Sequence, residues 1–555
     1  MPGLKLSLFV QRASQYLQLK DLRFTSAQIY DAATYIGFLI FVLALPFGYS
    51  TVFLNTGLSC VLFGWVGRII SDRKLGWQRT PLDVPILLFL GLGLIASLLA
   101  PHPAASSLGY FWKHLRAILL FYAVIHSQLG IRWRHIVIAF IAAAGISSAL
   151  GLWYYANDTR LAIDFMGRIG LQFQEELAVG EVPNLQMSDE LRAELRKCNV
   201  PLSQTATFVT SKQPDEWRID DPARNRRYTV RKGETHLMVY MIEQRLTGTF
   251  KMPNDLGAYL ALTLPFVMGY FAAGCSRLVF RSERLEAHRK SRRALIGMIV
   301  GLGVVLVLMG ANLALTLTRA AWVSVAVAVV GTGCYFVVNA LFTRVSWKRS
   351  LLAVAFISVV FCVLIVNTNS RQTISDIVPR HIKERIETMI AHPAGFMSER
   401  PQWWRTSLQL IRKYPLTGIG LGRFRYEYQH NGPEEQYYTP YHAHNIYLHI
   451  ATEQGIPSLL LFLWMVAIIC RQVVIMRKTS ELRHDDDHDR VASKNDFWQM
   501  GTFIGASGFL ISALVYGLAD NILHQRTVLL FYFMIGIIFY AQLSQDKKHE
   551  TSESD

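Results

Sequence analysis

Charged residues are scarce in this chain of 555 residues: Asp, Glu, Lys and Arg make up 17% of it, whereas hydrophobic residues make up 52%. An average soluble domain carries about 25% charged residues, so this composition excludes an ordinary water-soluble fold of the same length. The scarcity predicts an all-α protein with many membrane spans, because a segment inside a bilayer must satisfy its backbone hydrogen bonds internally.

Cysteines are also few, and their positions exclude two kinds of stabilising site. Five of the six lie in or beside apolar segments, and Cys198 alone lies outside them. Neither a disulfide framework nor a zinc site fits this distribution. The N-terminal region lacks the small-residue cleavage site of a secretory signal, so we expect the first apolar run to remain as a signal anchor.

About twelve apolar segments are long enough, or nearly so, to cross a bilayer as helices, which takes about 20 residues for a layer of about 30 Å. They are residues 29–48, 51–71, 83–100, 115–130, 136–156, 254–274, 294–315, 321–342, 350–367, 446–475, 498–518 and 527–544. Lys and Arg are concentrated in the N-terminal tail and in every even-numbered connection, which predicts that these and both termini are cytoplasmic. The net charge of +16 is then mostly a consequence of membrane topology, and no nucleic-acid partner is expected.

Two long connections fall on the opposite, extracytoplasmic side, and they set the predicted domain organisation. Residues 1–156 hold the first five spans, 157–244 a small inserted α/β domain, 245–367 spans six to nine, 368–445 a helical extracytoplasmic catalytic loop, and 446–555 the last three spans and a cytoplasmic tail. In the insertion, Ser188–Arg196 has a helical pattern, and Arg227–Tyr240 has the alternation and turn of a hairpin.

The catalytic loop is predicted to hold two helices. One runs over about 377–390. The other runs from about Pro401 to Lys413, with Trp404, Leu408 and Ile411 as its apolar stripe. Gly418, Gly420 and Gly422 follow, and they allow close approach of the backbone.

Arginines and histidines are the chemically informative residues on the extracytoplasmic side. Arg245 lies shortly before Pro253-Asn254, and Arg319 lies in the connection between spans seven and eight. Arg400 directly precedes the second predicted helix of the loop, and Arg405 lies within it. A guanidinium stays protonated and can bind phosphate oxygens through two hydrogen bonds. His442 and His444 end the loop in the run His-Ala-His-Asn, and a positioned imidazole can accept a proton from a hydroxyl.

These segments, together with Tyr414–Gly422 and Glu453–Ile456, resemble in order and spacing the O-antigen ligase and polysaccharide polymerase superfamily. The resemblance covers about residues 245–475. It implies a GT-C-like membrane glycosyltransferase of the bacterial inner membrane, with its active site on the periplasmic face. The enzyme would transfer a glycan from polyprenyl diphosphate to a sugar hydroxyl, of lipid A-core or of a growing glycan.

The resemblance also implies residue roles. Arg245 and Arg319 would bind the donor diphosphate, and His444 would be the base. Arg400 and Arg405 would either hold phosphate or pair with Glu399 and Glu427. His442 is the alternative base, and Asn445 would either orient the imidazole or cap the next helix. No cofactor is expected. Metal-dependent membrane glycosyltransferases usually place paired acidic residues in the first outside loop, and that loop is about Gly48–Ser50, so we expect a metal-independent, inverting transfer.

Other interpretations remain open at this stage. The motifs do not separate a ligase, which we favour, from a polymerase. Each arginine could instead reach lipid headgroups from the membrane interface, and His442 could be an ordinary loop residue. A secondary transporter with twelve spans is a different class, but the sequence shows no repeat between its halves, and its polar residues lie in an outside loop rather than within the spans.

Overall fold

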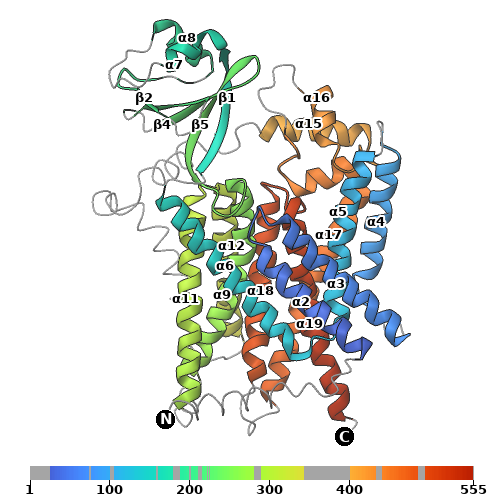
Figure 1. Ribbon diagram of the computed structural model, residues 1–555. Helices are drawn as coiled ribbons and strands as arrows, with labels where there is room; N and C mark the ends of the chain where they lie inside the picture. The colour runs from blue at the N-terminus through green and yellow to red at the C-terminus, as the bar shows by residue number, and fades with distance from the viewer. Residues whose placement is uncertain are drawn as a thin grey trace, which may run out of the picture.

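The protein is a bundle of long helices with a small β domain at one end, as the computed structural model shows (Figure 1). The structure describes residues 25–553, except for 74–76, 101–104, 158–160, 179–187, 199, 201, 211–214, 222, 224–225, 281–288, 343–399, 433–439 and 486–493. The bundle helices are α2 (Ser26–Ala44), α3 (Thr51–Asp72), α4 (Asp83–Leu98), α5 (Ala105–His126), α6 (Trp133–Ala156), α9 (Pro253–Phe280), α11 (Arg289–Leu315), α12 (Arg319–Phe342), α17 (Ile446–Asp485), α18 (Lys494–Gly517) and α19 (Gln525–Glu553).

Within the described residues, nine helices are long and apolar enough to cross a membrane, and α4 and the stretch Arg319–Cys334 of α12 are shorter apolar helices. This confirms a polytopic, mostly helical membrane protein. Eleven of the predicted segments fall on these helices, whereas residues 350–367 and the predicted helix 377–390 lie outside the described residues, so the count of twelve stays a prediction. The apolar stretch of α9 is 83% buried and that of α11 only 11%. Hence α9 lies at the centre of the bundle and α11 at its edge.

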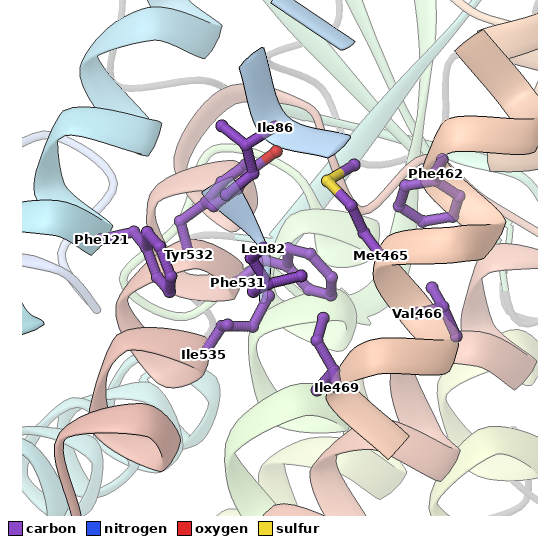
Figure 2. Close-up of a pocket in the computed structure, with 10 residues that line it drawn as sticks. All are labelled: Leu82, Ile86, Phe121, Phe462, Met465, Val466, Ile469, Phe531, Tyr532 and Ile535. Carbon is purple, nitrogen blue, oxygen red and sulfur yellow. The ribbon is translucent and has the colours of Figure 1, made fainter. Parts of the chain in front are cut away.

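The largest difference from the sequence prediction in this bundle concerns the start of α5. The apolar run predicted a span beginning at residue 115, but the helix begins at Ala105. Hydropathy missed residues 105–114 because this stretch contains the polar residues Lys113 and His114. Further along the same helix, Phe121 lines a small apolar pocket together with side chains of α4, α17 and α19 (Figure 2).

The β domain is an antiparallel five-stranded sheet in the order β1-β5-β4-β3-β2. Its strands are β1 (Leu161–Gly170), β2 (Thr207–Thr210), β3 (Glu216–Asp221), β4 (Arg226–Lys232) and β5 (His236–Leu246). The predicted hairpin is present as β4 and β5, and the predicted helix as α8 (Asp189–Lys197), which Ser188 caps by accepting from the Leu191 N–H. Leu191 and Leu195 of α8 and the short α7 (Gln174–Ala178) cover one face of the sheet. Because β5 ends at Leu246, the strand carries Arg245 back to the bundle.

Two short helices, α15 (Arg400–Lys413) and α16 (Phe424–Asn431), lie at the same end of the bundle as the β domain (Figure 1). The loop between them packs on a kink in α17, where Gly455 has φ 82° and ψ 169° and precedes Pro457. Ile456 N donates to the Pro415 carbonyl at 2.8 Å. A Cβ at Gly455 would lie 2.2 Å from the Leu416 carbonyl oxygen, so only glycine fits this position.

We therefore expect Gly455→Ala to lower the thermal stability of the protein in detergent. The combination of φ 82° and ψ 169° is essentially restricted to glycine and costs an alanine about 1–3 kcal/mol, and the clash with Leu416 adds to this cost. The matched control is Gly301→Ala in α11, where a Cβ would meet nothing within 4 Å. Equal melting temperatures for the two variants, measured by scanning fluorimetry, would contradict this account of the kink.

Candidate active site

The centre of the candidate site is a hydrogen bond between His444, just before α17, and Asp520, in the loop between α18 and α19. Nδ1 of His444 lies 3.1 Å from Oδ1 of Asp520. Both side chains are largely buried, with exposures of 15% and 11%. A carboxylate can only accept, so Nδ1 of His444 carries the hydrogen and Nε2 keeps a lone pair. This is the tautomer that a general base requires.

Asp520 is held as a carboxylate by its neighbours. Burial alone would raise its pKa, but His444, His442 and the Asn521 N–H together hold the pKa well below its usual range. Asn521 N donates to Oδ1 at 2.8 Å, and the Tyr516 hydroxyl donates to Oδ2 at 3.2 Å. The negative charge therefore persists at neutral pH and stabilises an imidazolium at His444.

His442 lies beside His444 with ring centroids 4.1 Å apart, but it is in a different state. Its Nδ1 accepts the backbone N–H of His444 at 3.2 Å, so the ring hydrogen is on Nε2. Burial, reinforced by His444, lowers the pKa of His442 well below its usual range. His442 is therefore neutral at pH 7, and it supports the His444 loop through its acceptor nitrogen.

The His444 loop is also fixed by two tryptophans of α15. Trp403 packs on the His444 ring with centroids 4.7 Å apart, and Trp404 Nε1 donates to the Ala443 carbonyl at 3.1 Å. His444 itself has φ +47°, a left-handed conformation that is uncommon for residues other than glycine and costs free energy. Such strain persists only where the surroundings enforce it, as these tryptophans and Asp520 do.

Three arginines meet beside this pair. Arg319 begins α12 and lies close enough to Arg400, the first residue of α15, and to Arg245 of β5 for their charges to repel. Arg400 also acts electrostatically on Tyr516, the residue that donates to Asp520. Three predicted arginines, far apart in sequence, are thus brought together next to the predicted base. Like charges gathered in this way favour an anionic ligand.

The start of α9 links the arginines to Asp520. Arg245 donates from Nη2 to Asn254 Oδ1 at 2.8 Å and from Nε to the Thr316 carbonyl at 3.0 Å. The backbone carbonyl of Asn254 lies 3.3 Å from the Tyr516 hydroxyl and is the alternative acceptor for the one hydrogen that this hydroxyl can donate to Asp520. Helices α9, α12, α15 and α17 all begin at this site, and the N-terminus of a helix carries partial positive charge. The helix N-termini and the guanidinium groups therefore both favour binding of an anion at this site.

A comparison with protein families bears directly on this geometry. Residues 304–463 match the family described as O-antigen ligase. This match supports the O-antigen ligase superfamily for that part of the chain. Among curated proteins, none matches this chain. The matched ligase region contains Arg319, Arg400, His442 and His444, whereas Arg245 and Asp520 lie outside it and reach the site through the fold.

Two residues predicted for the site, Arg405 and Asn445, are placed differently from the others. Arg405 is exposed on α15 and is not among the residues gathered around Asp520. Asn445 caps α17, because its Oδ1 accepts from Tyr447 N and Leu448 N, both at 3.0 Å, and its Nδ2 donates to the Leu518 carbonyl. Of the two roles considered for Asn445, the structure supports the cap.

The apolar stripe predicted for α15 is wrong. The helix buries Trp403, Thr406, Ser407 and Leu410, whereas Leu408 is 47% exposed. Ser407 can be buried because its hydroxyl donates to the Trp403 carbonyl at 2.7 Å. A hydropathy pattern cannot identify buried polar residues whose hydrogen bonds are satisfied within their own helix. The predicted buried face of α15 was therefore displaced by one residue from the observed face.

The glycines that follow α15 are held against α17 by Glu453. Glu453 is buried in α17, and its carboxylate accepts from Gly422 N at 2.8 Å and Phe424 N at 3.2 Å. A Cβ at Gly418 would lie 2.4 Å from the Glu453 carbonyl carbon. These contacts attach the glycine-rich loop, and through α15 the tryptophans, to the helix that follows His444.

His442, His444 and Asp520 are the one group in the described part of the chain whose ligand atoms, all within 4.8 Å of one another, could hold a metal ion. Nδ1 of His442 and Oδ1 of Asp520 already accept backbone hydrogen bonds, so a metal bound there would compete with His444 N and Asn521 N. Metal-independent chemistry stays a prediction, which the assay described below tests with a chelator.

Sequence reasoning missed Asp520, Tyr516 and a second histidine group. His524 lies with its ring 5.0 Å from that of His442, and burial together with the nearby His449 lowers its pKa to about 4. The available signal was the short run Asp520-Asn521 to His524, a polar connection between the last two spans on the same side as the histidine loop.

Proposed function

We propose that this protein is a ligase that transfers a whole glycan from polyprenyl diphosphate to a hydroxyl group of an acceptor sugar, that of lipid A-core. The observation that carries the proposal is the His444–Asp520 pair next to Arg245, Arg319 and Arg400. It unites a base and an anion site in one place, which glycosyl transfer from a diphosphate requires. The match of residues 304–463 to the O-antigen ligase family supports an enzyme of this class.

The arginines would act on the leaving group. As the bond between the anomeric carbon and the phosphate oxygen breaks, its electron pair passes to the diphosphate. Guanidinium groups that already face this oxygen stabilise the new charge without reorganising. Arg245 is held by Asn254 and Thr316, so its position is set before the substrate arrives.

His444 would act on the acceptor. The acceptor oxygen forms the new bond to the anomeric carbon, and its proton moves to Nε2 of His444, while Asp520 stabilises the imidazolium. Attack opposite the leaving diphosphate inverts the anomeric configuration. The reaction balances with a polyprenyl diphosphate and one proton as the other products.

The localisation follows from this proposal and from the distribution of basic residues. The site, the β domain and α15 lie at the same end of the bundle (Figure 1), and the basic connections predict that this end is periplasmic and that both termini are cytoplasmic. The substrates would then be a lipid-linked glycan that has already crossed the inner membrane and a membrane-bound acceptor.

A transfer assay with purified protein tests the function. The protein is incubated in EDTA with a polyprenyl-diphosphate-linked glycan and lipid A-core, and the products are separated by gel electrophoresis. We expect the glycan on lipid A-core, with equal rates in EDTA and in added Mg²⁺. If the donor glycan were elongated and lipid A-core were not modified, the protein would be a polymerase of the same superfamily rather than a ligase. Loss of transfer in EDTA would refute the metal-independent mechanism.

A further inference from the structure

Helix α16 is packed on the same small core as the candidate base. Its residues Phe424 and Tyr428 form this core together with Trp403 of α15 and Ala443 of the histidine loop. Trp403 is also the side chain that packs on the His444 ring, with centroids 4.7 Å apart. One hydrophobic cluster therefore fixes α16 and the base relative to each other.

The opposite face of α16 is exposed and carries aromatic and cationic side chains. Arg425, Tyr426, Gln429 and His430 are exposed, and their one- and four-residue spacing puts them on one side of the helix. The rings of Tyr426 and His430 lie with centroids 4.3 Å apart. Glu427 is the one carboxylate among the residues of α16, and it is only 6% exposed. The exposed face is therefore polar and basic rather than acidic.

Tyr441 extends this face toward the base. The guanidinium carbon of Arg425 lies 4.2 Å from the centre of the Tyr441 ring, and Tyr441 is still 53% exposed. Tyr441 lies three residues before His444, which limits the distance between their Cα atoms to about 11 Å. In the same way Arg423 lies over the Tyr426 ring at 4.5 Å. Two accessible tyrosine rings, each with an arginine packed on it, thus lie near the base.

Tyrosine and arginine side chains in this arrangement suit the sugar rings of an oligosaccharide. The C–H groups on one face of a sugar carry partial positive charge, whereas the face of an aromatic ring is negative, so the two stack. A guanidinium beside the ring donates N–H hydrogen bonds to the sugar hydroxyl groups. Because the arginines are already ordered on the rings, less conformational freedom is lost when the sugar binds.

The position of the base decides which glycan reaches this face. In the proposed reaction His444 takes the proton of the acceptor hydroxyl, so the sugar that carries this hydroxyl lies at His444. The other sugars of the acceptor then extend over the neighbouring surface. The donor diphosphate would lie with Arg245, Arg319 and Arg400, which belong to β5, α12 and α15 and not to α16.

We propose that Arg425, Tyr426 and Tyr441 form a subsite for the oligosaccharide of the acceptor lipid. The inference rests on the proposed function and deepens it. Tyr441 stacks on a sugar close to the accepting hydroxyl, Arg425 donates to the hydroxyl groups of that sugar, and Tyr426 contacts a sugar further along the chain. Binding there holds the hydroxyl beside His444, so the enzyme selects its acceptor by the sugars as well as by the lipid.

Replacing Tyr441 with alanine tests the subsite. We expect the acceptor KM to rise about tenfold or more, as for the loss of an aromatic anchor, with the main effect on KM rather than on kcat. Arg425→Gln should raise the same KM, and Tyr441→Phe, which keeps the ring, should retain most of the affinity. Both side chains are exposed, so the variants should fold. A rise in the donor KM with an unchanged acceptor KM would overturn the acceptor subsite.

Tyr49→Ala is the matched control. Tyr49 lies between α2 and α3, is 62% exposed and has the cation of Lys251 at 5.9 Å from its ring centre, but it is not part of the core that holds α16. It should keep the wild-type acceptor KM. An equal rise of this KM in Tyr49→Ala and Tyr441→Ala would give both tyrosines a general role at the membrane surface and overturn the subsite.

Direct binding separates failure of the subsite from failure of the proposed function. The probe is the core oligosaccharide freed of lipid A, titrated into wild type and Tyr441→Ala without donor and followed by thermophoresis. If wild type binds the probe more tightly than the variant but transfers no glycan, the subsite stands and the proposed function fails. If wild type transfers the glycan but binds the probe no more tightly than the variant, only the subsite fails.

Discussion

Replacing His444 with alanine should lower the rate of glycan transfer by about 10²- to 10⁴-fold, the usual contribution of a general base. The reason is the hydrogen bond to Asp520, which leaves Nε2 of His444 as the acceptor for the proton of the incoming hydroxyl. The variant should still bind the donor, because the arginines remain in place. The measurement is the initial rate of transfer with both substrates saturating, together with donor binding by thermophoresis.

Two variants distinguish a catalytic role of His444 as the base from a structural role of the histidines. Asp520→Asn keeps the size of the side chain but removes the charge that stabilises an imidazolium, so it should also reduce the rate strongly. His442→Gln should reduce it much less, because the neutral His442 only accepts a hydrogen bond from the backbone of His444. If His442→Gln were the more damaging of the two histidine variants, the assignment of the base would have to be reversed.

Arg319→Gln should lower the transfer rate by about 10²- to 10³-fold, as the loss of one preorganised donor to a developing charge commonly does. Arg319 stands among Arg245 and Arg400 at the start of α12, where the leaving diphosphate would gain charge. Arg319→Lys should fall between wild type and Arg319→Gln, because it keeps the charge and loses the forked geometry.

The control for Arg319 is Arg412→Gln, which removes an exposed arginine near the end of α15. It should transfer at the wild-type rate. The rate and the donor KM are measured for all three variants. An Arg319→Gln enzyme with an unchanged rate would refute the diphosphate site and leave Arg319 as an interfacial residue.

Sequence patterns predicted the membrane helices well because hydropathy and length are local properties. They also located Arg245, Arg319, Arg400 and His444, which the structure gathers at one site. They could not predict Asp520, which lies 76 residues from His444 in sequence and meets it only through the packing of α17 and α18. Hydropathy failed at the start of α5 and on the buried face of α15, because both contain polar residues in buried surroundings.

The left-handed backbone at His444 also determines which amino acids can replace it in a protein that still folds. Asparagine, aspartate and glycine tolerate this conformation far better than β-branched residues do. The asparagine side chain is polar and not basic, and its amide extends about as far from the backbone as the nearer atoms of the imidazole ring. His444→Asn is therefore the substitution of choice for capturing donor and acceptor together on an intact but inactive enzyme, whereas valine or isoleucine at the same position would mainly report a folding defect.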